Sequence, residues 1–225
     1  MTKRFVQELE NLRNLLLEMG SVVEQQISGV VDALMRNDKE LARELVEKDE
    51  EIDDLEIRID QLCEEIIALS QPVAADLRLI VAGFKMSNDL ERMGDQAKNV
   101  AIETIHMDPP IDKPLLKKMR LDVMSKFAED MLSDALDSFV HGDAPQAKSV
   151  CEMDDEVDDI NLYLIKKLSE DNGFQLSHSQ RIGVILIAQN LERIGDLATN
   201  IAEDVIFLVK AKVIKHGYEQ YQQDS

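Results

Sequence analysis

The chain repeats itself at a spacing of nearly half its length. Residues 90–101 (LERMGDQAKNVA) match residues 191–202 (LERIGDLATNIA) at eight of twelve positions, with an offset of 101. Residues 49–55 (DEEIDDL) match residues 154–160 (DDEVDDI) at four of seven positions, with an offset of 105. A duplicated segment of this size folds as two similar units, and the difference in offset falls in the loop between the two matched stretches.

Apolar residues recur at steps of three and four through nearly the whole chain, which predicts amphipathic helices. The predicted helices cover residues 5–35, 38–70 and 72–106 in the first half, and residues 113–140, 143–169 and 177 onward in the second. They are separated by turn signals, namely Asp38 as an N-cap, Pro72, Asp108-Pro109-Pro110, His141-Gly142-Asp143 and Asn172-Gly173. With 4% aromatic residues, 9 Gly and 5 Pro, a β-sandwich, barrel or α/β sheet is excluded. We expect an all-α fold of six long helices, a tandem duplication of two three-helix bundles over residues 1–108 and 113–217.

The charge of the chain argues against one class of partner. Its 45 acidic and 25 basic residues give a net charge of −20, which disfavours binding to DNA or RNA.

The two cysteines, Cys63 and Cys151, are too few for a disulfide framework and fit a reducing compartment. No stretch approaches 18 consecutive apolar residues. We therefore expect a soluble cytoplasmic protein that does not insert into membranes.

Pairs of carboxylates spaced four residues apart occur twice in each half. They are Asp49/Asp53, Glu91/Asp95, Asp154/Asp158 and Glu192/Asp196. Residues four apart are neighbours on one helix face. A hairpin that turns near Ser70-Gln71 places Asp49 and Asp53 opposite the helix that carries Glu91 and Asp95, and the second half repeats this arrangement. The sequence therefore predicts a cluster of four carboxylates in each half.

Further residues extend the two predicted clusters. A turn near residues 36–37 sets Glu24 opposite Asp49, and the equivalent turn sets Glu129 opposite Asp154. Asn99 and Asn200 follow each acidic stripe four residues later. Gly94 and Gly195 lie within predicted helices, where glycine costs up to ~1 kcal/mol relative to alanine, so a close neighbour or ligand is expected beside each.

Four carboxylates gathered between helices repel one another and lose hydration, so they need a counter-charge. A bound cation supplies one. An all-oxygen set of ligands favours Mg²⁺, Mn²⁺, Ca²⁺ or iron over tetrahedral zinc. Two alternatives remain open at this point: Arg92 and Arg193 neutralise the acids, or the acids are simply solvated.

Three motifs together carry a family resemblance. They are Glu-Arg-Met-Gly-Asp at 91–95, Glu-Arg-Ile-Gly-Asp at 192–196 and Gln-Pro-Val-Ala-Ala-Asp-Leu-Arg at 71–78. In these features the chain resembles the PhoU family. The resemblance implies a homodimeric cytoplasmic accessory of the phosphate-specific importer, without enzymatic activity, that restrains phosphate uptake and the phosphate-starvation response. It further implies two partners, the importer's ATPase subunit and a phosphate-sensing histidine kinase.

The resemblance also implies multinuclear metal clusters, with iron, zinc, Mg²⁺ or Mn²⁺ as the metal. The residues that match the family's motifs are Asp49, Asp53, Glu91, Asp95, Asp154, Asp158, Glu192 and Asp196. The second half departs from the pattern, because the Pro-x-Ala-x-Asp-Leu-Arg stretch at 72–78 has no counterpart near 173–179. The alternative function is a carboxylate-bridged bundle that stores metal or hydrolyses a substrate with it.

Overall fold

A computed structural model describes residues 3–170 and 174–211 of the chain. Every regular element in these two ranges is an α-helix. The helices are α1 (Lys3–Arg36), α2 (Lys39–Glu47), α3 (Glu50–Ser70), α4 (Ala74–His106), α5 (Lys113–Lys118), α6 (Leu121–His141), α7 (Ala144–Ser169) and α8 (His178–Lys210). The prediction of an all-α fold is confirmed.

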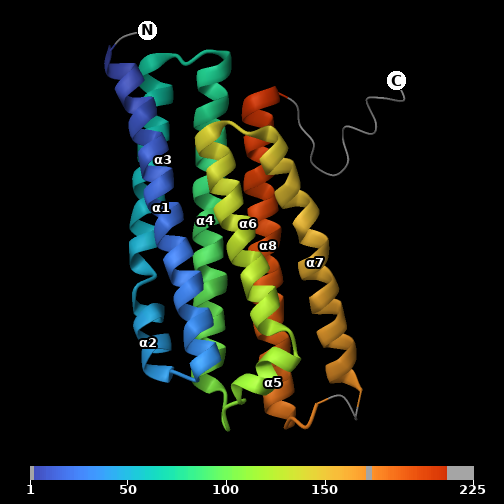
Figure 1. The fold of residues 1–225 in the computed structure, drawn as a ribbon. Helices are drawn as coiled ribbons and strands as arrows, with labels where there is room; N and C mark the ends of the chain where they lie inside the picture. Colours follow the sequence, from blue (N-terminus) through green and yellow to red (C-terminus); the bar gives the residue numbers. More distant parts are fainter. Residues whose placement is uncertain (1–2, 171–173, 212–225) are drawn as a thin grey trace, which may run out of the picture.

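The long helices run up and down along one axis (Figure 1). Helices α4 and α8 lie side by side in the middle of the molecule and pack against each other. Helices α1 and α3 pack with α4, and helices α6 and α7 pack with α8. Each half is therefore a helical bundle, and the last helix of each half, α4 or α8, provides the main contact between the two.

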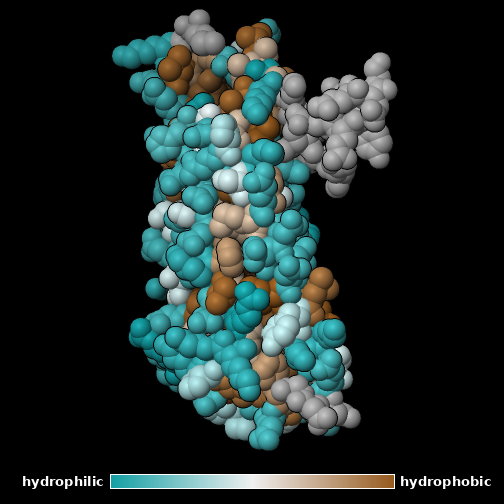
Figure 2. All heavy atoms as spheres, turned by 45° about the vertical axis from the view of Figure 1, so that its right-hand side comes forward, coloured by the Kyte–Doolittle hydropathy of each residue, from teal (hydrophilic) through white to brown (hydrophobic). Residues whose placement is uncertain are grey.

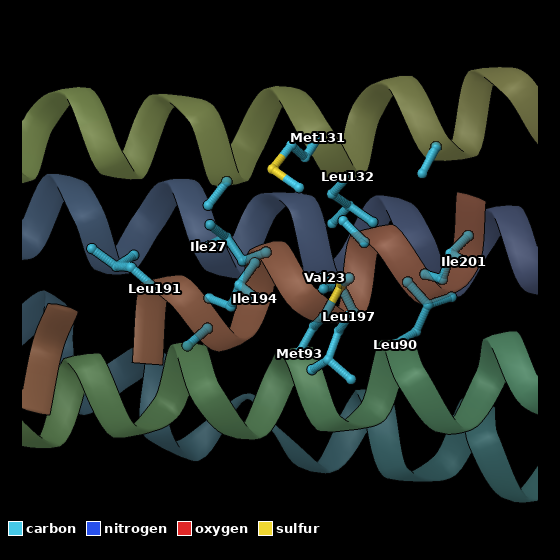
Figure 3. Close-up of a cluster of buried hydrophobic side chains, with 14 of the residues drawn as sticks. Val23, Ile27, Leu90, Met93, Met131, Leu132, Leu191, Ile194, Leu197 and Ile201 are labelled. Carbon is cyan, nitrogen blue, oxygen red and sulfur yellow. The ribbon is translucent and has the colours of Figure 1, made fainter. Parts of the chain in front are cut away.

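The hydrophobic core continues from one half into the other. Figure 3 shows Val23 and Ile27 of α1 and Leu90 and Met93 of α4 beside apolar side chains of α6 and α8. The side chains from the second half are Met131, Leu132, Leu191, Ile194, Leu197 and Ile201, and all ten labelled residues are fully buried. The burial of α4 and α8 against each other thus holds both halves in one folded unit.

Several predicted helix ends are confirmed by their capping contacts. The Asp38 side chain accepts a hydrogen bond from the backbone N–H of Leu41 (3.0 Å), as predicted for an N-cap. At the predicted break between α6 and α7, Gly142 has a left-handed backbone (φ 62°) and Asp143 caps α7. The predicted loop at Asn172-Gly173 and the end of the second unit at residue 217 lie outside the described residues.

The helix predicted over residues 38–70 is interrupted at Lys48-Asp49, which separates α2 from α3. Five consecutive polar residues lie between Val46 and Ile52, so no apolar side chain anchors this turn to the core. The Asp49 side chain is nevertheless buried. The interruption thus lies at one of the predicted ligands.

Two other helix boundaries differ from the prediction. The helix predicted over residues 113–140 is divided into α5 and α6 at Met119-Arg120, where Arg120 has a left-handed backbone (φ 63°). The side chains of Leu116, Met119 and Leu121 stay fully buried on both sides of this interruption. Helix α4 begins at Ala74, so Pro72 precedes the helix instead of occupying its first turn.

The face of the molecule in Figure 2 is covered mainly by hydrophilic side chains, with hydrophobic residues in smaller patches between them. This agrees with the large excess of acidic residues in the sequence. Among the described residues, no helix is both long enough and apolar enough to span a bilayer.

The continuous core predicts the effect of one substitution. Leu197→Ala removes a fully buried side chain from the region where α1, α4, α6 and α8 meet. We therefore expect the free energy of unfolding to fall by ~2–5 kcal/mol. The measurement is urea unfolding followed by circular dichroism. The matched control, Leu162→Ala, changes a side chain that is 64% exposed and should change stability by at most about 0.5 kcal/mol. Equal effects of the two substitutions would contradict a shared core.

Candidate metal centres

The first carboxylate cluster lies where the start of α3 meets the middle of α4. Burial and, after it, repulsion from Asp95, Asp53 and Asp49 together raise the pKa of Glu91 to about 7. Burial, followed by repulsion from Asp49, also raises the pKa of Asp53. The structure therefore brings together the four predicted acids of this half. Glu56, which was not predicted, also contributes to the repulsion at Glu91.

Asp49 is the most buried acid of this cluster, with 5% of its surface exposed. Its Oδ1 accepts a hydrogen bond from Gln26 Nε2 (3.1 Å), and its Oδ2 accepts one from Lys98 Nζ (2.6 Å). Lys98 Nζ also lies 4.0 Å from Asp95 Oδ1. These contacts raise the pKa of Lys98, the largest cause being its hydrogen bond to Asp49. The first cluster therefore already contains a cation of its own.

The second carboxylate cluster lies between α7 and α8. Burial and, after it, repulsion from Asp196, Asp158 and Glu192 together raise the pKa of Asp154 to about 7. The structure thus also brings together the four predicted acids of this half. The Oδ1 atom of Asp154 is buried and has no hydrogen-bond partner. A buried oxygen in this state lacks a hydrogen-bond donor or a cation as its partner.

The two arginines next to the motifs behave differently. Arg193 Nη1 lies 2.7 Å from Asp196 Oδ2, so the predicted alternative of neutralisation by arginine applies to one acid of the second cluster. Both side chains are about a third or more exposed. An ion pair of this kind contributes at most ~1 kcal/mol to the stability of the fold. Arg92 lies 3.8 Å from Asp89, which is not one of the predicted ligands.

The glycines of the two repeated motifs, Gly94 and Gly195, have the close neighbours that were expected. A Cβ atom on Gly94 would lie 2.8 Å from Ile52 Cδ1 and 3.5 Å from Asp49 Oδ1. A Cβ atom on Gly195 would lie 3.3 Å from Asp154 Oδ1. The missing side chains therefore allow α3 and α7 to bring a carboxylate close to the neighbouring helix.

The additional candidates lie elsewhere or at the edge of the clusters. Glu24 and Glu129 line one groove of about 200 Å³ between α1 and α6. Gln26, instead of Glu24, contacts Asp49, because the chain turns at Asn37-Asp38 and the opposing residue moves by two positions. Asn99 is exposed and Asn200 is partly buried, each one turn beyond its cluster.

Sequence reasoning missed Gln26 and Lys98, which hold Asp49. Lys98 lies three residues after Asp95 and seven after Glu91, so the acidic stripe of α4 contained the signal for it. Gln26 could be found only from the exact position of the turn between α1 and α2.

The two clusters differ in how well their donors suit the metal ions that the resemblance implies. Within residues 3–170 and 174–211, no group of three or more His, Cys, Asp or Glu side chains is arranged to hold a metal ion. In the second cluster the residue types fit a hard cation, and the unpartnered oxygen of Asp154 offers it a ligand. In the first cluster the inner carboxylate is occupied by Lys98. The second cluster therefore fits a metal better than the first.

Comparisons with known proteins agree with this architecture. The family model of the PhoU domain matches residues 16–104 and 121–205, once in each half. The chain is 40% identical to the phosphate-specific transport system accessory protein PhoU homolog of Zymomonas mobilis, over 93% of this chain and 88% of that protein. It is 32% identical to the Escherichia coli protein named phosphate-specific transport system accessory protein PhoU, over 95% and 88% of the two chains.

Solved structures are similar over the same length. The crystal structure of PhoU from Pseudomonas aeruginosa has a TM-score of 0.82 and 37% identity, covering 92% of this chain and all (100%) of that one. The phosphate transport system regulatory protein PhoU from Streptococcus pneumoniae has a TM-score of 0.85 and 28% identity, covering 94% and 99%. The duplicated motifs, the paired bundles and these similarities agree, and the chain belongs to the PhoU family.

Proposed function

We propose that this protein is a cytoplasmic accessory of phosphate-specific transport that restrains phosphate uptake and the phosphate-starvation response. The observation that carries the proposal is similarity over nearly the full chain to relatives named as accessory proteins of this transport system. Because the match includes both halves, the proposal concerns the whole chain and not one shared domain.

The proposed mode of action is binding. Helices α1, α4 and α8 each exceed 30 residues and offer long faces to protein partners. The proposed partners are the ATPase subunit of the phosphate importer and a phosphate-sensing histidine kinase. By holding both, the protein would keep the kinase pathway off while phosphate is abundant.

We also propose that the carboxylate clusters bind metal ions. The acids of the first cluster come from α4 and from α3 with the residue before it, Asp49, and those of the second come from α7 and α8. A cation that relieves repulsion between carboxylates of two helices stabilises their contact. The all-oxygen donors suit Mg²⁺, Mn²⁺ or iron, and the family resemblance adds zinc. Metal would thus fix the geometry of the helix faces that partners contact.

Metal binding predicts a change in thermal stability. A cation that binds only the folded state stabilises it by about 2.7 kcal/mol at a hundred times its dissociation constant, so Mn²⁺ should raise the melting temperature. The double variant Asp95→Asn/Asp196→Asn should lose most of this increase, since each exchange removes a charge at nearly constant volume. Differential scanning calorimetry with and without Mn²⁺ measures the effect.

The control for this experiment is Glu10→Gln/Asp137→Asn, which removes two exposed acids outside the clusters. Its Mn²⁺-dependent increase should equal that of wild type. If the Asp95/Asp196 variant also responds as wild type does, these residues are not ligands.

The regulatory role predicts a phenotype. Cells that lack this protein should express phosphate-starvation genes even in phosphate-rich medium, because the kinase pathway is no longer held off. The assay is a reporter fused to such a gene in deletion, complemented and Asp95→Asn/Asp196→Asn strains. Full repression in the deletion strain, with no paralogue present, would contradict the role. A double variant that represses normally would remove metal from the mechanism and leave the regulatory role standing.

A further inference from the structure

Asp49 has two polar partners from other helices in the first half. Gln26 of α1 donates to its Oδ1 and Lys98 of α4 donates to its Oδ2, at 3.1 and 2.6 Å. Gly94 marks the closest approach, because a Cβ atom there would lie 3.2 Å from Gln26 Oε1 and 3.5 Å from Asp49 Oδ1. Both oxygens of this buried carboxylate are therefore satisfied within the protein.

Asp154 occupies the equivalent place in the second half, and its surroundings differ in both partners. The repeat puts Met131 in the place of the glutamine and Thr199 in the place of the lysine, with the offsets of 105 and 101 found above. A Cβ atom on Gly195 would lie 3.6 Å from Met131 Sδ and 3.3 Å from Asp154 Oδ1. The close approach seen at Gly94 in the first half is therefore preserved in the second. Asp154 Oδ1 and Thr199 Oγ1 are both buried without a hydrogen-bond partner.

We infer that the two halves obtain their counter-charge from different sources: Lys98 is the resident cation of the first half, whereas a metal ion completes the second half and is held there more tightly. This inference rests on the proposed metal binding and assigns the difference in affinity to Lys98 and Thr199. The two clusters thus differ in metal affinity, although their acidic residues, four in each half, correspond one to one.

The physical reason is competition between cations for the same carboxylates. A metal ion that enters the first cluster must displace the Lys98 ammonium group from Asp49 or bind beside a like charge. In the second cluster Arg193 pairs with Asp196 on the partly exposed side and leaves Asp154 Oδ1 without a partner. Displacing an exposed pair of this kind costs little.

The test is isothermal titration calorimetry, in which Mn²⁺ is titrated into the chelator-treated, full-length protein. Wild type should show one tight class of binding. Asp196→Asn should remove this class, and Asp95→Asn should leave it unchanged, because the two substitutions affect different halves. The opposite pattern, with the tight class lost only in Asp95→Asn, would overturn the inference and leave metal binding itself standing.

Reciprocal variants test the role of the two assigned residues. Lys98→Thr should tighten Mn²⁺ binding to the first half on the order of tenfold, and this new tight class should disappear when Asp95→Asn is added. Thr199→Lys should weaken Mn²⁺ binding to the second half by a similar factor. The matched control is Lys117→Thr, which removes an exposed lysine of α5 and should change neither class.

A readout without metal separates this role from general packing. Lys98→Thr leaves the buried Asp49 without its cation, so the metal-free variant should melt at a lower temperature than wild type, and Mn²⁺ should restore most of the loss. Unchanged Mn²⁺ affinities in both reciprocal variants would overturn the inference alone. Absence of Mn²⁺ binding in every variant, wild type included, would overturn the proposed metal function and the inference with it.

Discussion

The packing of α4 against α8 is the contact on which the rest of the structure depends. These two helices carry the repeated Leu-Glu-Arg-x-Gly-Asp motif, and their apolar faces form a core shared by both halves. With those faces buried, Glu91 and Glu192 are left at the flanks, where α3 and α7 arrive with further acids. The hydrophobic arrangement therefore determines where the carboxylates meet.

Each cluster must then resolve the repulsion between its acids. Loss of hydration on burial and, after it, this repulsion raise the pKa values of Glu91 and Asp154. In the first half Lys98 relieves it from within the protein. In the second half a buried carboxylate oxygen is left unpartnered, and an external cation is the partner that we propose. The same repeated arrangement of carboxylates can thus be neutralised in two ways, by a lysine of the protein or by an external cation.

Much of the fold and the membership of both clusters was accessible from sequence, since these depend on periodicity and on the repeat. The interruption at Lys48-Asp49 was not, because a polar run inside a helical pattern has no sharp breaker such as proline or glycine. The sequence set Glu24 opposite Asp49, but the residue of α1 that donates to Asp49 is Gln26, because the turn lies further along the chain and presents a different face of α1. Whether either cluster holds metal stays a prediction.

The sequence by itself determined the class of fold, the duplication and the eight acids, because helical period and repeated letters are local properties of the chain. Only the tertiary structure decided which side chains complete those acids. Gln26 and Lys98 reach Asp49 from two different helices, and Asp154 lacks such partners. The difference depends on how three helices pack to within hydrogen-bonding distance, and contacts at that range depend on interhelical register, which the pattern of one helix does not contain.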